Sequence, residues 1–77
     1  MKNYLTIAKK VDRFYKRYLF YDWSNAQGEY TMQDLADDLS IHLMVWIDDL
    51  TDILETFDPG SAGYQECISI IDDLRNL

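Results

Sequence analysis

Apolar residues recur at spacings of three and four over most of this 77-residue chain, and this period restricts the possible folds more than any other feature. Two short polar segments interrupt it, "SNAQGEYT" at 24–31 and "DPG" at 58–60. Only three glycines and one proline are present, which argues against disorder and against a turn-rich β fold. The pattern predicts an all-α fold, a small antiparallel three-helix bundle that forms one domain over residues 1–77.

Local signals set the expected helix boundaries. The first helix is predicted over residues 3–21, and the third over 61–75, with Cys67 on its apolar stripe. Thr31 and Asp34 have the spacing of a capping box, so the second helix is expected to start there and to run to about Phe57, where "DPG" ends it. Residues 24–31 are interpreted as a loop, and a short hairpin through 21–23 and 29–30 is the alternative.

The second helix has two contrasting faces when it is drawn at about 100° per residue. The core face is predicted to hold Leu35, Leu39, His42, Leu43, Trp46, Leu50, Ile53, Leu54 and Phe57. The opposite face holds seven acids over roughly 30 Å of helix, at about 1.5 Å rise per residue: Asp34, Asp37, Asp38, Asp48, Asp49, Asp52 and Glu55.

Ile41, Met44 and Val45 interrupt the acidic face at its centre. One interpretation is an ordinary solvated helix surface, and a second is that the first helix or the aromatic loop covers these residues. The third is a protein interface, which typically has an apolar centre and a charged rim. On that interpretation the partner-binding residues are Asp34, Asp37, Asp38, Ile41, Val45, Asp48, Asp49, Asp52 and Glu55.

Charge is divided sharply along the chain, whose net charge is −7. All the basic residues except Arg75 precede residue 21, and all the acidic residues except Asp12 follow it. The basic face expected on the first helix comprises Lys9, Arg13, Lys16 and Arg17. It could pair with the acidic helix within one chain or across a homodimer. Direct nucleic-acid binding is disfavoured, because the acidic remainder would repel phosphates.

No pattern typical of a catalytic or cofactor site is found, so the chain is predicted not to be an enzyme and to need no cofactor. The single histidine, His42, is expected in the core, and Cys67 is expected to act as a small buried hydrophobe. No acids stand at the ligand spacing of an EF-hand, so no metal site is predicted. A lone cysteine, an N-terminus unlike a signal peptide and the lack of an apolar run of about 20 residues predict a cytoplasmic protein that does not span a membrane.

These features favour a non-catalytic inhibitor whose carboxylates occupy the basic nucleic-acid-binding surface of a partner such as a nuclease. In charge and size it is similar to phage-encoded anti-CRISPR and anti-restriction proteins that act as DNA mimics, which would place it in the host cytoplasm. Two alternatives remain open: an immunity or antitoxin-like neutraliser of a basic toxin, and a self-assembling structural module.

Overall fold

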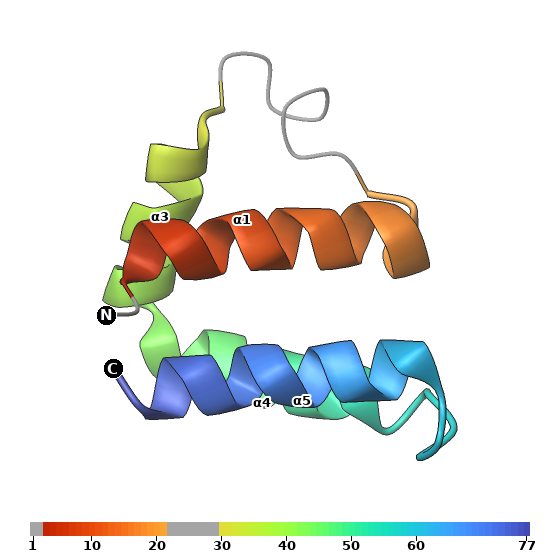
Figure 1. The fold of residues 1–77 in the computed structure, drawn as a ribbon. Coiled ribbons are helices and arrows are strands. Elements are labelled where there is room, and N and C mark those ends of the chain that lie inside the picture. The colour runs from red at the N-terminus through yellow and green to blue at the C-terminus, as the bar shows by residue number, and fades with distance from the viewer. Residues whose placement is uncertain (1–2, 22–29) are drawn as a thin grey trace.

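The computed structural model describes residues 3–21 and 30–77, which form four α-helices and one short π-helix (Figure 1). The helices are α1 (Tyr4–Phe14), η1 (Tyr15–Leu19, the π-helix), α3 (Met32–Ile41), α4 (Leu43–Leu54) and α5 (Ala62–Arg75). Because no strand occurs in these residues, the all-helical prediction is confirmed for the described part of the chain. The predicted loop and the alternative hairpin lie almost entirely outside the described residues.

The helices share a single apolar core. Figure 1 shows α1 and α5 running in opposite directions, with α4 beside α5 and α3 crossing the end of α1 where the chain begins. The core takes buried residues from all four α-helices, among them Val11, Leu39, Leu50 and Ile70. The chain therefore does not run as three helices, because the expected second helix is divided in two.

The division lies at His42, and the prediction of one helix from residue 32 to 57 is wrong. His42 has φ −116° and ψ 40°, so α3 ends at Ile41 and α4 starts at Leu43 in a new direction. His42 takes part in the last hydrogen bond of α3 and in the first of α4: its N–H donates to the Asp38 carbonyl (2.9 Å), and its carbonyl accepts from the Trp46 N–H (3.0 Å). The helix is bent rather than unravelled.

A side-chain hydrogen bond spans the bend. The indole Nε1–H of the buried Trp46 donates to the Asp38 carboxylate at 2.7 Å. In a straight helix, residues eight apart are separated by about 12 Å along the axis and by about 80° around it. The bend brings the two groups together, and it supplies the acceptor that a buried indole N–H requires.

The first helix also departs from regular geometry, although its predicted extent of 3–21 is nearly correct. Asn3 caps α1 by accepting from the Thr6 N–H (2.8 Å). After Phe14 the chain widens into η1, and it ends at Phe20, whose φ of 55° is left-handed. A π-helix shifts the side-chain register relative to an α-helix, and here Tyr15 and Tyr18 both belong to it.

An aromatic cluster joins the end of α1 to α4 and to the residues that follow α4. Ring centroids lie 5.9 Å apart for Phe14 and Phe57, 5.7 Å for Tyr18 and Phe57, and 6.2 Å for Tyr15 and Trp46. Gly63 admits the Phe57 ring, because a Cβ at that position would stand 2.7 Å from Phe57 Cε1. Edge-to-face pairs of this kind add about 0.5–1.5 kcal/mol each beyond area burial.

The predicted capping box is confirmed. The Asp34 N–H donates to Thr31 Oγ1 (3.2 Å), and the Thr31 N–H donates to Asp34 Oδ2 (2.9 Å), which completes the capping box. Ser61 caps α5 by accepting from the Tyr64 N–H (3.2 Å), and α5 ends at Arg75 as expected. These two caps fix where α3 and α5 begin.

Removing the carboxylate at the bend tests its contribution. We expect Asp38→Ala to lower the free energy of unfolding by about 1–3 kcal/mol, because the buried indole N–H loses its acceptor. Asp37→Ala is the control: among the described residues this exposed neighbour accepts only from Gln33 Nε2 (3.1 Å), and we expect a change within about 0.5 kcal/mol. Urea unfolding followed by circular dichroism measures both. Equal losses would show that the Trp46–Asp38 bond does not stabilise the fold.

Candidate functional site

The bend exposes a group of apolar side chains. Ile41, Met44 and Val45, here named the elbow patch, are 72%, 66% and 56% exposed, respectively. They border an open depression together with Ser40, His42 and Leu43. Neither α1 nor any other described segment covers Ile41 and Val45, so among the described residues the accessibility that the interface interpretation requires is present. Most of the aromatic loop, the other predicted cover, lies outside the described residues.

His42 lies at the surface, and its predicted place in the core is wrong. The reason is the bend itself: His42 is the residue at which the helix changes direction, and it is exposed while its neighbour Leu43 is half-buried. The single histidine therefore belongs to the same surface as the elbow patch.

The predicted acidic residues fall into two groups rather than one continuous ridge. On α3, Asp34 is committed to the capping box, Asp37 accepts from Gln33, and the half-buried Asp38 accepts from Trp46. The second group follows the elbow patch along the chain and is exposed: Asp48, Asp49, Asp52 and Glu55. Because the helix is bent, the ridge of roughly 30 Å that a straight helix would present is not formed.

We name these four residues of the second group the α4 carboxylates. Their side chains make no hydrogen bond or ion pair within the parts of the chain that the structure describes. Asp48 and Asp52 are spaced i,i+4, and Asp52 and Glu55 are spaced i,i+3, so like charges face each other along the helix. The last turn of α4 holds no basic residue, and acids there oppose the helix dipole. The group thus carries electrostatic repulsion that the chain does not relieve.

Burial and the charges of nearby carboxylates raise the pKa values of two tyrosines. Burial, and then the charge of Asp49, raises the pKa of Tyr15 to about 12. Burial, followed by the charges of Asp38 and Asp34, also raises the pKa of Tyr30. Both hydroxyls stay protonated at neutral pH, so neither adds further negative charge to the site.

Three of the basic residues of α1 and η1 form ion pairs away from α4. Lys16 lies 3.0 Å from Asp12 on α1, and Arg17 lies 3.3 Å from Glu66 on α5. Lys10 forms an ion pair with Asp73, which is only 4% exposed. Among the described residues, then, the ion pairs of the basic segment are made with α1 and α5, and the α4 carboxylates are not involved.

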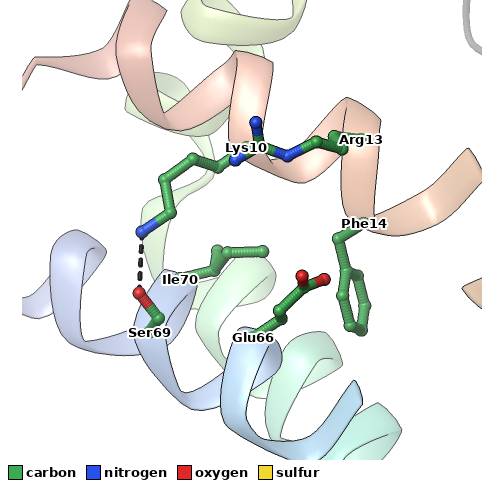
Figure 2. Close-up of a pocket in the computed structure, with 6 residues that line it drawn as sticks. All are labelled: Lys10, Arg13, Phe14, Glu66, Ser69 and Ile70. Atoms are coloured by element: carbon green, nitrogen blue, oxygen red, sulfur yellow. Dashed lines mark hydrogen bonds between the residues drawn. The ribbon is translucent and has the colours of Figure 1, made fainter. Parts of the chain in front are cut away.

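A pocket between α1 and α5 contains the Lys10 amine (Figure 2). Lys10 Nζ donates to Ser69 Oγ at 2.8 Å as well as to Asp73. Sequence reasoning missed this pair, although a signal was present: Lys10 follows Ile7 by three, and Asp73 follows Ile70 by three, so both lie along apolar stripes. A cation and an anion on facing stripes indicate a buried ion pair.

Cys67 is a small buried hydrophobe, as predicted. Its thiol donates to the Leu50 carbonyl at 3.3 Å, and burial raises its pKa to about 11. The described residues bring no three His, Cys, Asp or Glu side chains into a cluster that could hold a metal ion. In those same residues no helix has the length and apolar character to cross a membrane.

Comparisons with protein-family models, with curated proteins and with solved structures found no match.

Replacing Lys10 tests the buried ion pair. We expect Lys10→Met to lower the free energy of unfolding by about 2–3 kcal/mol, because it leaves Asp73 charged and buried without a partner. Partial exposure of Lys10 keeps the loss at the lower end of the usual range. The double variant Lys10→Met/Asp73→Leu should recover most of this loss, and Lys9→Met, an exposed change on the same helix, should have little effect. A double variant no more stable than Lys10→Met in urea unfolding would contradict the assignment.

Thiol labelling tests the environment of Cys67. With a pKa of about 11, the thiolate fraction at pH 8 falls roughly 100-fold below that of an ordinary cysteine. We expect labelling of the folded protein at pH 8 to be slower than labelling in 8 M urea by at least this factor. Comparable rates in the two conditions would show that the thiol is accessible in the folded state.

Proposed function

We propose that this chain is a non-catalytic protein-binding inhibitor. It would dock the elbow patch and the α4 carboxylates onto the basic, nucleic-acid-binding surface of a partner protein. The observation that carries this proposal is the continuity of an exposed apolar patch with four acids that have no partner in the described structure. Such a combination has the anatomy of an interface, with a desolvated anchor and a charged rim.

Electrostatics favours a basic partner over a neutral one. Like-charge pairs at i,i+3 and i,i+4 destabilise a helix by roughly 0.2–0.5 kcal/mol each, and lysines or arginines of a partner would relieve that repulsion. Opposite charge also accelerates the encounter between the two proteins. Ordered carboxylates on a helix can occupy positions that nucleic-acid phosphates otherwise fill, so the proposed result of binding is competition with nucleic acid.

The bend gives the proposed contact a particular shape. The elbow patch lies where α3 and α4 meet and borders an open depression, so a partner would contact apolar side chains there and the carboxylates that follow along α4. The three α3 acids are already used within the chain, and we assign them a smaller part in binding. Phage-encoded anti-CRISPR or anti-restriction activity, in the host cytoplasm, is the class of inhibitor that this charge and size fit best.

Partner capture with matched variants tests the proposal. The immobilised chain is exposed to the fraction of a host lysate that elutes from DNA-cellulose, and captured proteins are identified and purified. We expect a basic protein whose DNA binding the chain inhibits, with binding that weakens as salt increases. If no protein of this fraction is captured, or if DNA does not compete with the chain, the proposal is wrong.

The variants separate the two components of the surface. Asp48→Asn/Asp52→Asn should raise the Kd at least about tenfold and reduce its salt dependence, since two charged contacts are lost. Asp58→Asn/Asp72→Asn removes the same charge from exposed positions outside the α4 carboxylates and should leave the Kd within twofold. Ile41→Ser/Val45→Ser should weaken binding with little effect on unfolding, because both side chains are exposed in the free protein. If the two charge pairs weaken binding equally, net charge alone is responsible and the assigned site is wrong.

A further inference from the structure

We propose that the pocket between α1 and α5 binds a small monocarboxylate with a short apolar stem. The pocket has a volume of about 200 Å³ and is lined by Lys10, Arg13, Phe14, Glu66, Ser69 and Ile70. Drug-sized ligands occupy larger sites, of about 300–1,000 Å³, so this one suits an acid of only a few carbon atoms. It is formed by α1 and α5, whereas the elbow patch belongs to α3 and α4, and the inference does not depend on the proposed function.

Figure 2 shows how the two helices contribute to the pocket. Lys10 and Arg13 extend from α1 along one side, Glu66 and Ser69 rise from α5 on the other, and the Phe14 ring closes one end. Phe14 and Ile70 are each 1% exposed, so the apolar part of the lining belongs to the packed core and is held in place. Only the edges of these two side chains reach the pocket, so the alkyl stem of a ligand must be short.

Charge in the pocket is balanced except at one residue. The Lys10 amine is neutralised by Asp73, and the Glu66 carboxylate lies 3.3 Å from Arg17. Arg13 makes no hydrogen bond or ion pair with the described chain. The pocket therefore retains one uncompensated guanidinium group, whose planar fork of N–H donors matches the two oxygens of a carboxylate.

A second donor stands opposite Arg13. Ser69 Oγ accepts from Lys10 Nζ at 2.8 Å, and its own O–H makes no hydrogen bond within the described residues. Because a hydroxyl both accepts and donates, that proton remains available for a ligand oxygen. Arg13 and Ser69 thus provide donors from both helices.

The surrounding charges select a singly charged anion. Arg13 contributes one uncompensated positive charge to the pocket, and a single carboxylate neutralises it. Glu66 inside the pocket would repel a dianion such as inorganic phosphate more strongly than a monocarboxylate. The single unpaired cation, the two donors and the volume of the pocket all fit a small monocarboxylate.

Nuclear magnetic resonance titration tests the proposal on the intact chain. Sodium 3-methylbutanoate is added to ¹⁵N-labelled protein at constant ionic strength, with sodium chloride as the reference. We expect saturable shifts centred on the amides of Phe14, Ser69 and Ile70. The uncharged analogue 3-methylbutanamide, and inorganic phosphate, should each bind at least about fivefold more weakly.

Two charge variants decide whether Arg13 is responsible. Arg13→Gln should weaken 3-methylbutanoate binding at least about fivefold, which corresponds to the upper range for an exposed ion pair. Lys9→Gln removes the same charge from an exposed position of α1 outside the pocket and should leave the affinity within twofold. Unfolding measurements confirm that both variants are folded. The proposal is overturned if the shifts do not saturate, if the amide or phosphate binds as well as the acid, or if both variants lose affinity equally.

Discussion

The hydrogen bond from the Trp46 indole to the Asp38 carboxylate joins the two halves of the bend, and the arrangement of the molecule depends on that bend. With the chain turned at His42, α3 packs on α1 while α4 packs on α5. A straight helix could bury its apolar face along only one direction. The bend lets one amphipathic segment cover two neighbours, and it leaves Ile41, Met44 and Val45 on the exposed side. A chain this short buries only a small fraction of its surface, so a segment that packs against two neighbours adds buried area that the fold needs.

The sequence predicted which residues are helical, but it did not predict that the second helix changes direction at His42. The cap at Thr31 involves residues only three apart, so it could be predicted from the sequence alone. The cap at Ser61 is equally local, but it was not predicted. The bend could not be found in this way, because neither proline nor glycine marks it and the apolar period continues across His42 from Leu39 to Trp46. Asp38 and Trp46 lie on different faces of a straight helical wheel, so their contact is visible only once the bend is known. Here tertiary packing decided the local geometry.

The exposure of the apolar residues at the candidate site could be predicted from the sequence, but the different roles of the acids could not. Exposure of Ile41 and Val45 follows from their position opposite the core stripe, and that position holds on either side of the bend. The acids were treated as equivalent, however, and the structure separates them by what they contact. Those on α3 satisfy backbone and side-chain donors, as acids near a helix start commonly do. Those on α4 have no such role in the described structure, which makes their mutual repulsion a cost without an internal benefit.

The same electrostatic argument bears on the choice between a second copy and a different protein at the elbow patch. A two-fold dimer through this patch would bring two sets of α4 carboxylates toward each other, since the same surface is used by both copies. A head-to-tail contact would instead use the basic face of α1 and η1. There Lys10, Lys16 and Arg17 are already paired with Asp73, Asp12 and Glu66, and only Lys9 and Arg13 have no ion pair in the described structure. Breaking those pairs would offset much of what the new contacts contribute. A partner that brings its own cations avoids both costs, so the charge distribution favours a foreign basic surface over self-assembly.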